Sequence, residues 1–212
     1  MQHGSSEQRN AEWEAHGEFI KRYPNLRTFY KSGYLDAAGL TARMDAAAAD
    51  VDLFVIDHLH YIDSIDENEQ RAVRDMVARI RDVALALGKP VVLVAHLRKH
   101  DVRHGILPGL EDFHGSSNVV KIATHAVMLA RAPFDPDAPP NVRRTLMHVP
   151  KDRRDGASGY VALCEYDADA GLYRKGYQLG RVTRAGDRWE PIDHPPPSWA
   201  RNHRTLTTKG LR

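Results

Sequence analysis

Apolar and polar positions follow different spacings in different parts of this 212-residue chain. Residues 51–56 are apolar except for Asp52, and residues 90–95 are apolar throughout, a pattern typical of parallel strands that are buried on both faces. Between these runs, residues 67–87 carry apolar side chains at i, i+3, i+4 and i+7, which predicts an amphipathic helix that ends at Gly88. Strand, helix and strand in this order predict a βαβ unit, with parallel pairing and a right-handed crossover.

Shorter patterns predict the remaining elements and the domain limits. Helices are expected over residues 5–22, 36–49 and 116–123, and strands over residues 26–31, 125–130, 145–149 and 160–166, the last followed by a turn at 167–171. The β-prone pieces after residue 144 predict antiparallel additions to the sheet. Residues 176–212 are rich in proline and basic side chains, so we expect a folded core over residues 1–175 and a flexible tail after it.

The composition is that of an ordinary globular protein, with 42% hydrophobic and 27% charged residues. No apolar run approaches the ~20 residues that cross a membrane. The first residues lack the apolar segment of a signal peptide. Cys164 is the only cysteine, which excludes an intramolecular disulfide and fits a reducing compartment. We therefore expect a cytoplasmic protein with no membrane partner.

Polar residues directly follow both predicted parallel strands. Asp57 ends the first apolar run and His96 ends the second. Ligands of open α/β sheets bind in the crevice at the carboxyl ends of the strands. Asp57 is therefore expected where a magnesium ion bound to phosphate could be held. The long polar segment 96–115 is expected to be a functional or mobile loop, and its residues 98–103 are locally basic.

The order of these features resembles the motor domain of hexameric replicative DNA helicases, the RecA-like and DnaB-like ring helicases. The resemblance covers residues 25–173. It rests on four segments, VDLFVIDHLHYID, KPVVLVAHLRKHD, LEDFHGSSNVVKIATHAVMLAR and VPKDRRDGASGYVALCEYDADAGLYR. It implies an α/β fold, with a RecA-like, mainly parallel sheet flanked by helices and an antiparallel C-terminal extension. It also implies ATP-dependent unwinding of, or translocation on, DNA by a ring that is expected to be a hexamer of identical subunits.

The resemblance also implies roles for four residues that act with ATP and Mg²⁺. Asp57 would hold the magnesium ion through water, and His96 would sense the γ-phosphate at the tip of the adjacent strand. Arg153 would be an arginine finger that reaches the nucleotide of the neighbouring subunit. Lys151 would assist at the same phosphate.

A further implication is that Arg98, Lys99 and Arg103 line a central channel, where they would contact the phosphates of single-stranded DNA. The phosphate-binding pattern G-x-x-x-x-G-K-[ST] is absent, because Gly88-Lys89 is followed by Pro90. The chain therefore resembles the C-terminal part of such a motor, and alone it is expected to hydrolyse ATP poorly or not at all.

Two alternatives remain open on the sequence. Without a phosphate-binding loop, the chain could be a catalytically silent RecA-like subunit that binds nucleic acid or a partner protomer. His58-x-His60 could instead be the metal pair of a hydrolase, although that chemistry usually occupies a TIM barrel of ~250 residues. The alternation after Asp57 favours burial of Leu59 and Ile62 and exposure of the two histidines.

Overall fold

The computed structural model divides the chain into two units, residues 1–34 and residues 35–212. The described residues are 13–14, 17–19, 21–29, 36–59, 69–97, 107, 109–113, 117–132, 134–154, 156, 158–183 and 189–203. In the first unit, residues 17–19 and 21–22 are helical, and the rings of Phe19 and Tyr23 lie 5.0 Å apart. Most of the helix predicted over residues 5–22 lies outside the described residues. Residues 26–29, where a strand was predicted, contain none.

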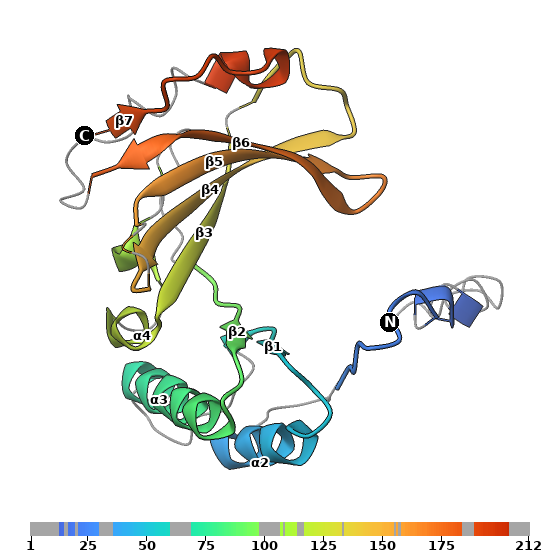
Figure 1. The fold of residues 1–212 in the computed structure, drawn as a ribbon, viewed down its shortest axis with the longest axis vertical. Helices are drawn as coiled ribbons and strands as arrows, with labels where there is room; N and C mark the ends of the chain where they lie inside the picture. The colour runs from blue at the N-terminus through green and yellow to red at the C-terminus, as the bar shows by residue number, and fades with distance from the viewer. Residues whose placement is uncertain are drawn as a thin grey trace. The chain divides into compact units, whose positions relative to one another are not determined.

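The second unit contains a helical and parallel part followed by an antiparallel part (Figure 1). Its elements are α2 (Ala37–Ala47), β1 (Phe54–Ile56), α3 (Glu69–Leu87), β2 (Val91–Leu93), η2 (Leu110–Asp112), α4 (Ser117–Ile122), β3 (His125–Arg131), β4 (Val142–Asp152), β5 (Tyr160–Asp167), β6 (Leu172–Val182), β7 (Trp189–Pro191) and η3 (Ser198–His203).

The predicted βαβ unit is confirmed. β1 and β2 pair in parallel, with Phe54 opposite Val91, and α3 connects them. Gly88 ends α3 with a φ of 64°, a left-handed conformation that favours glycine. Upstream, the Asp36 carboxylate accepts a hydrogen bond from the backbone N–H of Gly39 at 2.7 Å, which caps the start of α2. Both strands are shorter than the apolar runs that predicted them.

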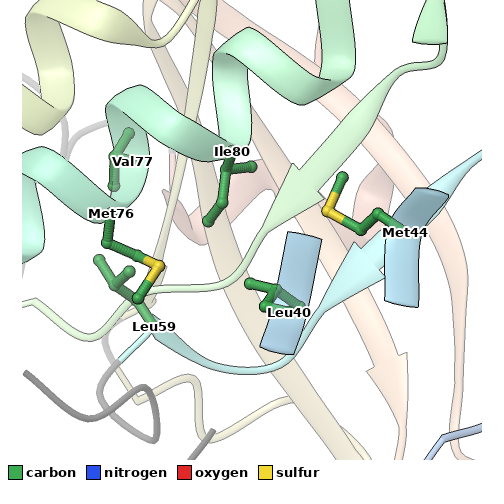
Figure 2. Close-up of a cluster of buried hydrophobic side chains, with 6 residues drawn as sticks. All are labelled: Leu40, Met44, Leu59, Met76, Val77 and Ile80. Carbon is green, nitrogen blue, oxygen red and sulfur yellow. The ribbon is translucent and has the colours of Figure 1, made fainter. Parts of the chain in front are cut away.

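A hydrophobic cluster joins α2 and α3 to one face of the parallel strands (Figure 2). The cluster consists of Leu40, Met44, Leu59, Met76, Val77 and Ile80. From the strands, Phe54, Ile56, Val91 and Leu93 pack against it. On the opposite face, Val55 is 63% exposed and Val92 is 49% exposed. Among the described residues, the helices of this cluster therefore cover one face of the two strands, whereas continuous apolar runs favour burial on both.

The second sheet has five strands in the order β3-β4-β5-β6-β7, and each neighbouring pair is antiparallel. Short connections explain this, because a parallel pair needs a crossover of a dozen or more residues. Buried apolar residues of β4, β5 and β6 form a second cluster with Ala200 of η3. This cluster contains Leu146, Val161, Leu163, Leu179, Val182 and Ala200.

The sequence-based prediction of a mainly parallel sheet is not met in the described part of the chain. Parallel pairing there is limited to β1 and β2, and the apolar run at residues 125–130 forms β3, which is antiparallel to β4. An apolar strand alone does not reveal its direction, and the short loop between β3 and β4 decides it. The predicted antiparallel extension is present, and it is larger than expected because it begins at β3.

The boundary expected at residue 175 falls inside strand β6. Beyond it, β7 pairs with β6, Ala200 belongs to the second cluster, and Trp199 packs against that cluster. Ala200 is fully buried. Residues 204–212 lie outside the described residues, and the flexibility expected for the tail stays a prediction.

We expect the chain to need its last described segment for stability. A variant that ends at residue 183 should lose about 2 kcal/mol or more of unfolding free energy, because it loses the packing of Trp199 and the pairing of β7. A control that ends at residue 203 should match the full chain. Urea denaturation measures both, and equal midpoints for all three proteins would show that residues 189–203 contribute nothing.

Candidate functional site: the carboxyl edge of the parallel strands

Parallel pairing brings the two predicted strand-end residues to the same edge of the sheet. Asp57 follows β1 directly and is exposed, and His96 lies three residues beyond the end of β2 and is also exposed. The N–H of Val94 donates to the carbonyl oxygen of Ile56 at 2.9 Å, and the N–H of Leu59 donates to the carbonyl oxygen of Val94 at 3.0 Å. These bonds hold the two segments side by side beyond the strands.

The imidazole rings of His58 and His96 are in contact at this edge. Their centroids lie 4.2 Å apart and the ring planes are tilted by 48°. Leu59 is 1% exposed, as the alternation after Asp57 predicted. His58 is half-buried, so the predicted exposure of this residue is wrong: its ring packs against the second strand end. Ile62 and His60 lie outside the described residues.

The metal-pair alternative gains no support from the described residues. They contain no group of three or more histidine, cysteine, aspartate or glutamate side chains that could hold a metal ion. Catalytic zinc sites use three protein ligands and a water. An aspartate that binds magnesium through water needs no such group, because phosphate oxygens and water complete the coordination.

Lys151 and Arg153 lie together near the end of β4 and face the C-terminal end of α4. The ammonium of Lys151 donates to the carbonyl oxygen of Val120, and also to that of Lys121 at 3.4 Å. The guanidinium of Arg153 donates to the same Lys121 oxygen at 2.7 Å. The last carbonyls of a helix have no partner inside the helix and carry partial negative charge, so two cations stabilise this end.

Asp152, between these two cations, points to the neighbouring strand β3. Its carboxylate lies 3.1 Å from Nε2 of His125, and it also accepts a hydrogen bond from the N–H of Arg154 at 2.9 Å. The hydroxyl of Thr124 lies 3.0 Å from Nδ1 of His125. Alternation along the strand thus separates the carboxylate from the two cations on either side of it.

Burial is the main cause of a lowered pKa at Lys151, and the positive charge of Arg153 lowers it further. An ammonium that is partly removed from water and lies beside a second cation holds its proton less tightly. Lys151 therefore titrates below the usual range of a lysine.

The predicted DNA-contacting residues Arg98, Lys99 and Arg103 lie outside the described residues, so the structure does not place them. Of the predicted catalytic residues, it brings Asp57 and His96 to one sheet edge, and Lys151 and Arg153 to the end of α4. These two pairs belong to different sheets.

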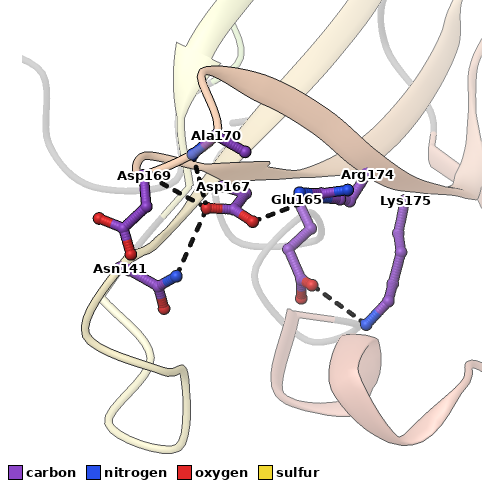
Figure 3. A network of polar contacts seen from close by, with 7 residues as sticks. All are labelled: Asn141, Glu165, Asp167, Asp169, Ala170, Arg174 and Lys175. Carbon is purple, nitrogen blue, oxygen red and sulfur yellow. Dashed lines mark hydrogen bonds and ion pairs between the residues drawn. The ribbon is translucent and has the colours of Figure 1, made fainter.

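The sequence did not reveal a row of charges across the antiparallel sheet. Arg144, Glu165 and Lys175 occupy opposite positions on β4, β5 and β6. Arg144 forms an ion pair with buried Asp135 and lies 3.7 Å from Glu165. The other carboxylate oxygen of Glu165 lies 3.1 Å from Lys175 (Figure 3). The cations of Arg144 and Lys175 each lie 5.9 Å from the ring of Trp199. No local pattern gives this row, because it depends on strand register.

The carboxylate of Asp167 is the centre of a second set of polar contacts, at the turn between β5 and β6 (Figure 3). Its Oδ1 accepts hydrogen bonds from the N–H groups of Asp169 and Ala170 at 3.1 and 3.2 Å. Its Oδ2 accepts from Nε of Arg174 at 3.1 Å. The bond from Ala170 is the largest cause of a lowered pKa at Asp167, and the bond from Arg174 adds to it. This group shapes the hairpin and lies apart from the strand-end residues in sequence.

Comparison with solved structures shows what the fold resembles. The chain is similar to a solved ATPase domain with a TM-score of 0.55 and 18% identity, covering 68% of this chain and 52% of that one. It is also similar to a DnaB-like replicative helicase whose interactions with primase were studied, with a TM-score of 0.59, 17% identity, and coverage of 76% and 40%. The chain thus spans about half or less of these two proteins. Identities this low show the fold alone.

Sequence comparison then identifies the family. The sequence profile of the DnaB-like helicase C terminal domain matches residues 4–171, so the chain belongs to this family. The match begins closer to the N-terminus than the resemblance at residues 25–173 suggested. A comparison with curated protein sequences gave no match. Within the described residues, we find no helix with the length and hydropathy of a membrane span.

The pair at the end of α4 gives a titration that tests its geometry. Replacing Arg153 with alanine should raise the pKa of Lys151 toward its usual range, because a neighbouring positive charge is removed. The pKa should stay below that range, because burial persists. Arg154→Ala is the matched control and should leave Lys151 unchanged. Nuclear magnetic resonance (NMR) titration of lysine side chains measures this, and an unchanged pKa in Arg153→Ala would contradict the contact.

Proposed function

We propose that this chain is part of the ATPase motor of a replicative DNA helicase, and that the carboxyl edge of β1 and β2 faces the nucleotide. Membership of the DnaB-like helicase C terminal domain family supports the motor. The observation that carries the proposal is the parallel pairing of β1 and β2, which sets Asp57 and His96 at one edge. Ligands of α/β sheets bind at this kind of edge.

Asp57 is proposed to hold Mg²⁺ through a bound water beside the β- and γ-phosphates of ATP. Its carboxylate is exposed, so a hydrated ion can approach it. His96, exposed on the adjacent strand end, is proposed to sense the γ-phosphate. Loss of that phosphate would then change the contacts of the residues that follow His96. Arg98, Lys99 and Arg103 belong to that segment, and we propose that they contact the phosphates of single-stranded DNA.

Arg153 is proposed to act on the nucleotide of a neighbouring subunit, with Lys151 beside it, in a ring that we propose is a hexamer. In the chain alone, Arg153 donates to the Lys121 carbonyl oxygen yet remains exposed. An exposed guanidinium exchanges one acceptor for another at little cost, and phosphate is the stronger acceptor. Arginine fingers accelerate phosphoryl transfer by ~10³–10⁵. Lys151 is more buried and would stay at α4 as a fixed positive charge.

A second candidate is a catalytically silent RecA-like subunit that binds nucleic acid or a partner protomer. The missing G-x-x-x-x-G-K-[ST] pattern favours it, because no backbone cradle for phosphates is encoded in these residues. Both candidates predict weak ATP hydrolysis by this chain alone. They differ in whether Asp57 and Arg153 matter to the complete ATPase that contains the chain.

Asp57→Asn tests the nucleotide edge in the complete ATPase. Hydrolysis should fall to background, because a neutral amide cannot hold hydrated Mg²⁺ as a carboxylate does. The free energy of unfolding should change by less than about 0.5 kcal/mol, since the side chain is exposed. Asp52→Asn is the matched control at the other end of β1, where Asp52 lies 3.5 Å from Lys89. Steady-state turnover decides, and full activity in Asp57→Asn would remove this carboxylate from the mechanism.

Arg153→Ala tests action between subunits. A ring made only of this variant should lose turnover by about 10³-fold or more. Mixing it with Asp57→Asn subunits should restore part of the activity, because interfaces then form between an intact Arg153 and an intact Asp57. The readout is turnover as a function of mixing ratio. No recovery at any ratio would argue against a finger that acts across the interface. If the homogeneous Arg154→Ala ring loses turnover, the Arg153→Ala ring keeps it, and mixing restores the former, the role belongs to Arg154.

A further inference from the structure

His58 and His96 come from different strands and meet at the carboxyl edge, 38 residues apart in the sequence. Their ring centroids are 4.2 Å apart and the rings are tilted by 48°. The two residues differ in environment: His58 is half-buried and His96 is exposed. The exposed ring of His96 therefore has the partly buried ring of His58 as a neighbour.

The backbone on either side of this contact is fixed. Leu59, next to His58, is 1% exposed and packs in the cluster with Met76 of α3. The N–H of Leu59 donates to the carbonyl oxygen of Val94, two residues before His96, at 3.0 Å. A residue between a strand end and a buried leucine has little backbone freedom, so the Cα–Cβ bond of His58 keeps its direction toward the second strand end.

We propose that His58 is a positioning residue that fixes the imidazole of His96 at the carboxyl edge. An exposed side chain at a strand end samples several staggered rotamers. Contact with a tilted aromatic ring at 4.2 Å favours the rotamer that keeps the rings together. His58 thereby sets the direction in which His96 presents its ring nitrogens. What His96 then faces rests on the proposed function, whereas the contact itself does not.

Positioning explains the pair better than metal binding. Two imidazoles fall short of the three protein ligands of a catalytic zinc site. In the ranges that the structure describes, no third histidine, cysteine or acid completes such a group. A positioning role requires only an aromatic ring at position 58, whereas metal binding requires a ring nitrogen. A substitution that keeps the ring and removes the nitrogen therefore distinguishes positioning from metal binding.

The test uses the side-chain NMR signals of His96 in the full 212-residue chain, assigned from their loss in His96→Gln. In His58→Ala, these signals should shift toward those of a freely rotating, solvent-exposed histidine, because the ring current and the rotamer restriction of His58 are lost. His58→Phe should restore them toward the wild-type positions, since it retains a ring without a metal-binding nitrogen. His194→Ala is the control, because it removes an exposed histidine elsewhere and should leave His96 unchanged.

Unchanged His96 signals in His58→Ala, or failure of His58→Phe to restore them, would overturn the proposal. If His58→Ala does not fold, His96→Ala probes the contact from the exposed side, and the His58 signals must then shift. The NMR measurement requires no nucleotide. Full turnover of the complete ATPase with Asp57→Asn would therefore contradict the proposed function and leave the His58 contact unaffected. Unchanged His96 signals in His58→Ala, together with loss of turnover in Asp57→Asn, would contradict the positioning role and leave the proposed function unaffected.

Discussion

The parallel pairing of β1 and β2 is the constraint on which the candidate site depends. Each strand has only three residues, and the pair keeps its register because Phe54, Ile56, Val91 and Leu93 pack on a cluster formed by α2 and α3. Shifting one strand by a single residue would turn its apolar side chains to the opposite face. Burial on the helical face therefore fixes which residues emerge at the carboxyl edge, and Asp57, His58 and His96 emerge there together.

The antiparallel sheet is stabilised in a different way. Its strands bury an apolar cluster, and they also bury charged groups, of which Arg144, Asp135 and Glu165 are all nearly inaccessible to solvent. Removing one partner of such a group leaves an uncompensated buried charge, which costs about 3–5 kcal/mol. The cross-strand row of Arg144, Glu165 and Lys175 therefore penalises any shift of register between β4, β5 and β6. The cations of the same row contact Trp199, which links the last described segment to the sheet.

Local patterns predicted the elements well where one physical cause dominates. The apolar spacing of α3 and the stop at Gly88 are local, and both agree with the structure. The edge position of Asp57 and His96 followed from the βαβ order alone. Local patterns did not predict three long-range features: the direction of β3, the extension of β6 beyond residue 175, and the packing of Trp199. All three depend on contacts between segments that are distant in the sequence. His58 was expected to point to solvent because alternation says nothing about a neighbouring strand end.

We propose that the carboxyl edge of β1 and β2 faces a magnesium-bound triphosphate. The most direct measurement is an experimental structure of the complete ATPase that contains this chain, determined with Mg²⁺ and a non-hydrolysable ATP analogue. In that structure, we expect Asp57 to lie one water molecule away from the ion and His96 to face the terminal phosphate, with Arg153 approaching from a neighbouring subunit. Nucleotide bound away from this edge, with Asp57 remote from the ion, would contradict it.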